Sequence, residues 1–320
     1  MTAMEQNTYC QIVSKMKKYS VETYLDKSFS ELTTLGCGGK IRITIYPDGV
    51  RKLIKCVRLL DRLKVTYCIL GRGSNVLCSD DVYDGVVVVT TKMKAFRVRG
   101  RYAYALAGAS TVTLGNALKN KGLTGGEFLA CLPATVGGAV VTNAGCYGQQ
   151  IDGVVKSVKA LLCGKVRRLS AKQCKFGKRK SLFTQNDGYV ILSVKLKFAR
   201  STPQQVSEKI NEMRSKKSAT QPLKFRSAGS ALYHDKVAVS RLIDEAGLKG
   251  YTVGGAQVSE RHAGFVINID KATSKDIYLV IRHMQRTLRD RYGLDAKIEI
   301  RLINFTEDST KDGNDFFPER

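Results

Sequence analysis

Long apolar runs and histidine clusters are both missing from this sequence of 320 residues. No apolar stretch approaches the roughly 20 residues that a helix needs to cross a bilayer. Residues 1–19 alternate polar and apolar side chains with scattered lysines, which is not the pattern of a secretory signal. The three histidines do not lie near cysteines at the spacing of a zinc site. We therefore expect a cytoplasmic protein with no membrane segment and no metal.

Paired cysteine motifs are missing too, although the sequence contains nine cysteines. The cysteines are scattered from Cys10 to Cys174, and no two of them form a C-x-x-C pair. Because nothing marks a secreted protein, we expect reduced thiols and not a disulfide framework.

Acidic residues are few relative to basic ones. The chain has 53 Lys and Arg against 28 Asp and Glu, a formal net charge of +25. A positive electrostatic field of this size attracts both anionic small molecules and nucleic acid. The basic residues are dispersed, and the clusters at 165–168 and 178–180 are too short for a nucleic-acid-binding arm. A solvated basic surface is the ordinary interpretation, and nonspecific RNA binding is still expected.

Hydrophobic periodicity predicts a chain of mixed α and β structure, long enough for two or three domains. The first part contains a helix at about 5–18 and a small βαβ unit, formed by a strand at 41–46, a helix at 50–60 and a strand at 65–70. A β-rich part follows, with a hairpin around 99–101 and a helix at 114–121. Its other predicted strands lie at 86–90, 154–162, 166–169 and 189–199.

A third part begins where Thr202 precedes Pro203, a pattern typical of a helix start. We predict helices at 203–217, 237–246 and 274–292, a loop at 221–231, and strands at 251–258, 264–268 and 296–303. Residues 307–320 are polar and are expected to form a frayed tail.

Two glycine-bearing loops are the most informative segments. Residues 129–148 read LACLPATVGGAVVTNAGCYG, and residues 70–75 read LGRGSN after an apolar strand. Small residues let the backbone approach a bulky ligand, and exposed backbone N–H groups bind anions. Neither loop fits G-x-G-x-x-G, and GRGSN lacks the lysine of a Walker loop. The pair predicts a pyrophosphate cradle of another type.

Eight sequence blocks together carry a family resemblance. They are TTLGCGG at 33–39, GRGSN at 71–75, PATVGGA at 133–139, NAG at 143–145, FGKRKS at 176–181, SAGS at 227–230, GGAQVSE at 254–260 and IEIR at 298–301. In this order they resemble the UDP-N-acetylenolpyruvoylglucosamine reductases, also called UDP-N-acetylmuramate dehydrogenases. The chain resembles the shorter branch of that family, because it has no long insertion.

The resemblance implies an α+β flavoenzyme of three lobes. An FAD-binding domain of the vanillyl-alcohol-oxidase type would consist of two α+β subdomains, and a C-terminal α+β domain would bind the substrate. The implied ranges are an N-terminal extension at 1–30, the two FAD-binding subdomains at 31–85 and 86–200, the substrate-binding domain at 201–305, and a tail at 306–320.

The resemblance also implies the reaction and the ligands. Noncovalent FAD, reduced by NADPH, would reduce the enolpyruvyl group of UDP-N-acetylenolpyruvoylglucosamine to give UDP-N-acetylmuramate, a peptidoglycan precursor. We expect a monomer with no specific nucleic-acid partner. The cofactor candidates are Gly71, Arg72, Gly73, Ser74, Asn75, Pro133, Thr135, Gly137, Gly138 and Asn143.

Three side chains match the catalytic residues of the family. Arg179 would hold the substrate carboxylate and offset its developing charge. Ser230 would donate the proton, which requires neighbours that polarise its hydroxyl. Glu299 would either assist protonation or orient the intermediate, and the sequence leaves both open.

Three departures from the family pattern keep alternatives open. Lys178 stands where Tyr is usual, Ala134 stands where Gly is usual, and residues 232–235 read LYHD where the family reads close to FKNP. The Asn of that motif ordinarily helps to hold the substrate diphosphate, and Lys216 or Lys217 is a candidate to replace it. The alternatives are a related flavin oxidase or dehydrogenase with another substrate, and a basic nucleic-acid-binding protein on a retired enzyme fold.

Overall fold

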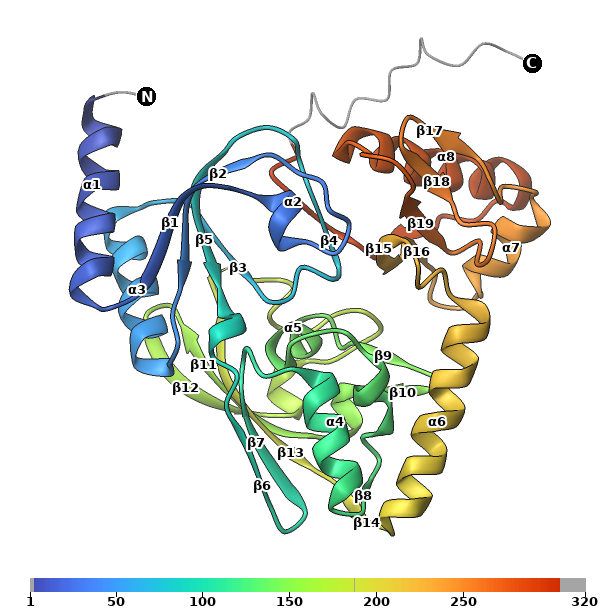
Figure 1. Cartoon of the computed structure of the whole chain (residues 1–320), viewed down its shortest axis with the longest axis horizontal. Helices are drawn as coiled ribbons and strands as arrows, with labels where there is room; N and C mark the ends of the chain where they lie inside the picture. The colour runs from blue at the N-terminus through green and yellow to red at the C-terminus, as the bar shows by residue number, and fades with distance from the viewer. Residues whose placement is uncertain (1–2, 187, 306–320) are drawn as a thin grey trace. The chain divides into compact units, whose positions relative to one another are not determined.

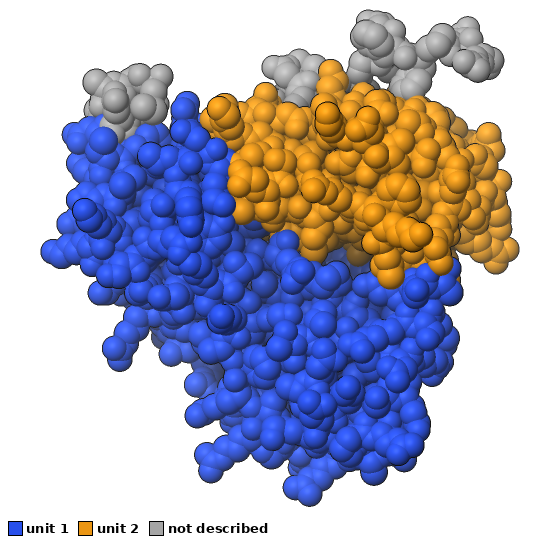
Figure 2. All heavy atoms as spheres, in the orientation of Figure 1, with its two compact units in different colours: residues 1–27, 41–72, 84–219 blue, residues 28–40, 73–83, 220–320 orange. Residues whose placement is uncertain are grey.

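The structure, a computed structural model, describes residues 3–186 and 188–305, which fall into two compact units (Figure 2). The described residues within 1–27, 41–72 and 84–219 form unit 1, and those within 28–40, 73–83 and 220–320 form unit 2. Each unit therefore combines segments that are distant in the sequence. The predicted tail at 306–320 lies outside the described residues.

The first sheet of unit 1 has four strands in the order β1-β2-β5-β3 (Figure 1). The strands are β1 (Glu22–Ser28), β2 (Lys40–Tyr46), β5 (Tyr83–Val89) and β3 (Tyr67–Leu70), with β3 parallel to β5. Helix α3 (Val50–Leu63) buries Leu53, Val57 and Leu60 at helical spacing. These side chains form one core with the sheet and with Ile12 and Met16 of α1 (Ala3–Lys18).

The second sheet of unit 1 has five antiparallel strands in the order β12-β11-β13-β7-β6. The strands are β6 (Phe96–Arg99), β7 (Tyr102–Leu106), β11 (Val155–Leu162), β12 (Lys165–Ser170) and β13 (Val190–Lys197). Alternate apolar residues, among them Ala105 and Val194, share a core with α4 (Thr111–Asn120) and α5 (Val136–Val141). Helix α6 (Pro203–Thr220) packs Val206 and Ile210 against Ala130.

Shorter elements complete unit 1. Strand β8 pairs with β14, and β9 pairs with β10. Their bounds, with those of the 3-10 turns, are η1 (Thr90–Lys92), β8 (Leu123–Thr124), η2 (Glu127–Cys131), β9 (Gly145–Cys146), β10 (Gln149–Gln150), η3 (Ile151–Gly153), η4 (Lys172–Cys174) and β14 (Ala199–Arg200).

Unit 2 is built on a sheet in the order β15-β19-β18-β17. Helix α8 (Ser274–Tyr292) starts at a capping box between Thr273 and Asp276, ends before Gly293 with φ +61°, and packs Ile281 into the core. Strand β16 pairs with β20, and β21 runs parallel to β4. The remaining bounds are α2 (Phe29–Leu32), β4 (Val76–Cys78), β15 (Arg226–Ser230), β16 (Leu232–Tyr233), α7 (Val239–Glu245), β17 (Thr252–Val253), β18 (Ala256–Val258), β19 (Phe265–Asn268), β20 (Lys297–Ile298) and β21 (Arg301–Ile303).

The predicted α+β class is confirmed, as are the long helices and the hairpin of β6 and β7. Three predictions were wrong. The strand at 251–258 is a hairpin of β17 and β18, which pair with each other across a turn at Gly254 with φ +51°. The loop at 221–231 contains β15, whose alternation is hidden by Gly229 at φ +84° and by an irregular register. The strand at 296–303 is divided into β20 and β21, because its halves pair with different partners. Strand β1 was missed because its side chains are mostly exposed and do not alternate.

The compact units divide the chain differently from the predicted linear ranges. Segment 73–83 belongs to unit 2 because β4 pairs with β21 near the C-terminus. Residues 201–219 belong to unit 1, where α6 is anchored by Val206 and Ile210. Such long-range pairings leave no mark in the local sequence pattern.

Candidate active site

In unit 1, Gly71 of the loop at 70–75 packs directly against Thr135 of the loop at 129–148. The Thr135 hydroxyl caps α5 by accepting from the Gly138 N–H at 3.2 Å. A Cβ on Gly71 would lie 2.4 Å from that hydroxyl oxygen, and a Cβ on Gly137 would lie 2.9 Å from the Ala107 carbonyl oxygen. Close packing therefore requires glycine at both positions. Pro133 precedes this turn and is exposed.

The two loops differ in what their backbone amides do. The Gly137 N–H donates to the Ala107 carbonyl at 2.7 Å, and the Val136 N–H donates to the Ala109 carbonyl at 2.8 Å. The N–H groups of Val136, Gly137 and Gly138 therefore all donate to other atoms of the protein. In the part of the chain that the structure describes, the amides of residues 71–75 donate no hydrogen bond. The loop at 71–75 is thus the better anion-binding segment.

Asn143 is fully buried and joins three segments of unit 1. Its Nδ2 donates to the Gly177 carbonyl at 3.0 Å and to Asp152 Oδ2 at 3.1 Å, and its Oδ1 accepts from the Asp152 N–H at 3.2 Å. Its φ of +46° lies in the left-handed region, which Asn tolerates better than most residues. These hydrogen bonds give the Asn143 side chain a structural role, and its predicted contact with the cofactor stays a prediction.

Arg179 lies on the turn that Asn143 holds. Gly177 and Lys180 exchange backbone hydrogen bonds at 3.0 and 3.2 Å, and Arg179 between them has φ +56°. The Ser181 hydroxyl donates to the Val141 carbonyl at 2.7 Å and fastens the turn to the end of α5. A left-handed arginine costs backbone energy, and such outliers cluster at functional sites. The turn therefore fixes where this half-buried side chain projects.

Unit 2 brings Ser230, Glu299 and Asn75 together. Ser230 pairs with Phe265 at the end of β15. The carbonyl of the next residue, Ala231, accepts from the Glu299 N–H at 2.8 Å, and the Asn75 side chain donates to the Glu299 carbonyl at 3.1 Å. Ser230 and Glu299 are both partly exposed, as a ligand-contacting pair must be. Gly73 and Ser74 belong to the same unit, whereas Gly71 and Arg72 belong to unit 1.

The unusual segment at 232–235 supports Glu299 structurally. Leu232 and Tyr233 form β16, which pairs with β20 immediately before Glu299. Asp235 forms an ion pair with Lys297 at 3.2 Å. The candidate replacements for the missing Asn have partners in unit 1. Lys216 pairs with Glu212 at 2.6 Å, and Lys217 donates to the Cys131 carbonyl at 2.7 Å. Burial lowers the pKa of the Lys217 ammonium.

The cysteines are free thiols, and several of them are buried. Burial raises the pKa of Cys37 and of Cys56 to about 12, so these two are protonated and unreactive near neutral pH. Within 3–186 and 188–305 there is no group of three or more His, Cys, Asp or Glu placed to hold a metal ion. Across the same residues, no helix is both long and apolar enough to span a membrane.

Two family models match this chain. Residues 41–170 match an FAD binding domain, and residues 221–303 match the C-terminal domain of UDP-N-acetylenolpyruvoylglucosamine reductase. The first match contains Gly71, both glycine loops and Asn143, and the second contains Ser230 and Glu299. Arg179 lies between the two matches.

Curated relatives cover nearly the whole chain. The reductase of Caldanaerobacter subterraneus subsp. tengcongensis is 33% identical over 296 residues, which are 91% of this chain and 98% of the relative. This chain belongs to the UDP-N-acetylenolpyruvoylglucosamine reductase family. The family's reductase from Clostridioides difficile is 31% identical over 93% of this chain and 98% of its own length. The crystal structure of the reductase from Thermus caldophilus matches with a TM-score of 0.76 and 28% identity, covering 88% of this chain and 98% of that one.

Proposed function

We propose that this protein is an NADPH-dependent, FAD-containing reductase that converts UDP-N-acetylenolpyruvoylglucosamine to UDP-N-acetylmuramate. The observation that carries the proposal is the 33% identity to a reductase of that name over 91% of the chain. Arg179, Ser230 and Glu299 would be its catalytic residues. The proposal places the protein in the synthesis of peptidoglycan precursors.

The residues present suit noncovalent FAD. The amides of 71–75 have no protein partner among the described residues and can receive the pyrophosphate. Neither Gly71 nor Gly73 can carry a Cβ without displacing its neighbours, since Gly73 would place one 2.2 Å from the Leu32 carbonyl oxygen. Neither loop contains a histidine that could form a covalent bond to the flavin. When bound, FAD supplies hydride chemistry that no amino-acid side chain provides.

The side chains of the protein would stabilise negative charge on the substrate and donate a proton to it. Arg179 would bind the carboxylate through two parallel hydrogen bonds and offset negative charge as the double bond is reduced. Ser230 would donate the proton from its hydroxyl, and the partly exposed strand end leaves that hydroxyl accessible. Glu299, tied by its backbone to the residue after Ser230, would orient the intermediate or assist protonation.

Product analysis tests the proposal directly. Purified holoenzyme is incubated with NADPH and UDP-N-acetylenolpyruvoylglucosamine, and the nucleotide-sugar is examined by mass spectrometry. The expected product contains two more hydrogens than the substrate. UDP-N-acetylglucosamine is the matched control, because it lacks the enolpyruvyl group and, in the absence of oxygen, should allow no NADPH consumption beyond the one equivalent that reduces the flavin. Flavin reduction by NADPH without any reduced sugar would instead indicate a flavoenzyme with another substrate.

A further inference from the structure

We propose that one face of the five-stranded sheet in unit 1 binds single-stranded nucleic acid without sequence specificity. The basic sheet face, as we call it, is defined by residues from all five strands: Arg97, Arg99, Tyr102, Tyr104, Ser157, Lys159, Arg168, Lys195 and Lys197. The proposal is independent of the reductase activity.

The strand register places these residues on the same face. Tyr104 is paired with Arg97 on one side and with Lys195 on the other, and Lys195 is paired with Ser157. A neighbouring row pairs Arg168 with Lys159. Cross-strand partners point to the same side of a sheet, so cations from β6, β11, β12 and β13 surround the tyrosine. A third row joins Arg99, Tyr102 and Lys197.

The charge of this face is not neutralised. The five strands contain no Asp or Glu, and all six cations except the half-buried Lys195 are exposed. Over the range that the structure describes, none of the six forms an ion pair with a carboxylate. Like charges on paired strands repel, so the arrangement costs stability unless an anion offsets it. It is therefore complementary to a polyanion.

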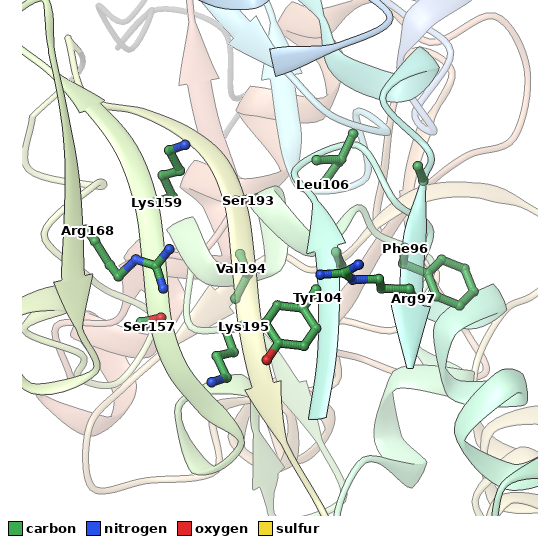
Figure 3. A pocket seen from close by; sticks show the side chains of 12 residues that line it. Phe96, Arg97, Tyr104, Leu106, Ser157, Lys159, Arg168, Ser193, Val194 and Lys195 are labelled. Atoms are coloured by element: carbon green, nitrogen blue, oxygen red, sulfur yellow. The ribbon is translucent and has the colours of Figure 1, made fainter. Parts of the chain in front are cut away.

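A hollow in the basic sheet face can receive a planar group. It has a volume of about 380 Å³, and its lining includes Arg97, Tyr104, Lys159, Arg168 and Lys195 (Figure 3). The Lys195 Nζ lies 4.4 Å from the centroid of the Tyr102 ring and 5.3 Å from that of Tyr104. One lysine thus lies near two aromatic rings of the adjacent strand.

This mixture favours nucleic acid over other polyanions. Proteins that bind single strands combine a positive surface for phosphates with aromatic rings on which bases stack. A face for anionic lipid would also carry several exposed large aliphatic side chains to enter the acyl region, whereas the residues that define the basic sheet face are six cations, two tyrosines and one serine, and Leu106 beside them is partly buried. Five strands spaced about 4.8 Å apart span about 19 Å, enough to contact several nucleotides.

The first test measures binding of the full-length holoenzyme to a fluorescent 20-nucleotide oligo(dT) by anisotropy at several salt concentrations. The variant Arg97→Ala/Lys159→Ala/Arg168→Ala should bind at least about tenfold more weakly. Its salt dependence, the slope of log K against log salt, should fall by about 2, since each phosphate contact on a single strand contributes about 0.7.

The matched control removes three exposed cations from helix α3, as Arg51→Ala/Lys55→Ala/Arg62→Ala. It lowers the net charge by the same amount and should leave the slope nearly unchanged. If both variants lose the same affinity, binding reflects net charge alone and the proposal is wrong. Unchanged flavin spectra and NADPH turnover in both variants would show that they are folded.

A second variant distinguishes binding of nucleic acid from binding of other polyanions. Tyr104→Leu keeps apolar bulk but removes the stacking ring, so oligo(dT) affinity should fall about fivefold or more with the salt slope unchanged. Inorganic polyphosphate, which has no bases, should bind wild type and Tyr104→Leu equally and more weakly than oligo(dT). Equal affinity for both probes, no effect of Tyr104→Leu, or preferential binding to phosphatidylglycerol vesicles would each overturn the proposal.

Discussion

Arg179 in unit 1 lies on a turn held by side chains, whereas Ser230 and Glu299 in unit 2 are held mainly by the backbone. The Arg179 turn depends on the amide of Asn143 and the hydroxyl of Ser181. In unit 2, the Ala231 carbonyl accepts the Glu299 N–H within a frame of paired strands. A single substitution can therefore displace Arg179 while the rest of its unit stays folded. Displacing Glu299 requires damage to the backbone frame or loss of the Asn75 side chain, which donates to the Glu299 carbonyl.

The largest expected effect comes from removing the guanidinium itself. Arg179→Ala should lower kcat by about 10²- to 10³-fold with FAD still bound, because transition-state charge is no longer offset. Arg179→Lys keeps the charge but not the paired hydrogen bonds, and should recover only part of the loss. Steady-state kinetics with NADPH and the nucleotide-sugar measure both. Near-normal kcat in Arg179→Ala would remove this residue from the mechanism.

The backbone frame of unit 2 is tested at Gly73. An alanine there would place its Cβ 2.2 Å from the Leu32 carbonyl oxygen at a φ of +63°. Left-handed strain and overpacking together should lower the free energy of unfolding by about 2 to 5 kcal/mol. Gly247→Ala is the matched control, since Gly247 has φ +74° but open space around it. It should lose only about 1 to 2 kcal/mol, and equal losses in urea unfolding would refute the packing argument.

Asn143→Ala tests the side-chain support in unit 1. It removes the acceptor of the Asp152 N–H and one of the two donors to the Gly177 carbonyl, which keeps the Lys180 N–H, and this should cost about 1 to 3 kcal/mol of stability. Because the Arg179 turn loosens, kcat should fall about tenfold, as when outer hydrogen bonds of a site are removed. The neighbouring Thr142 is partly exposed and its hydroxyl makes only an exposed hydrogen bond to the Gly138 carbonyl, so Thr142→Ala should be nearly neutral. If flavin affinity fell while kcat of the FAD-loaded enzyme stayed normal, Asn143 would act on the cofactor and not on Arg179.

The smallest effect is expected at the unusual 232–235 segment. Asp235 and Lys297 form an ion pair with both side chains more than half exposed, at 54% and 60%. Exposed pairs contribute about 0 to 1 kcal/mol, so Asp235→Asn should change stability little and KM for the nucleotide-sugar by less than about twofold. A large rise in KM would show that Asp235 contributes to substrate binding.

The difference between the two units also explains what the sequence could predict. Helices α3 and α8 and the hairpin of β6 and β7 were predictable, because their patterns are local and periodic. The assignment of Arg179, Ser230 and Glu299 as catalytic residues rests on short motifs and stays a prediction. The task of Asn143 was not predictable, because its partners Asp152 and Gly177 are distant in sequence or lack a side chain. The predicted strand at 296–303 is interrupted at Glu299 because its two halves pair with β16 and with β4. No local sequence pattern indicates either of these distant partners.

The reductase proposal is tested most directly by the anaerobic visible spectrum of the purified protein. NADPH is added first and UDP-N-acetylenolpyruvoylglucosamine second, and the flavin absorption is followed throughout. We expect the flavin band to bleach with NADPH and to return with the nucleotide-sugar, and the Ser230→Ala variant to bleach but recover far more slowly. A wild-type band that stays bleached after the nucleotide-sugar is added would show that this sugar is not the substrate.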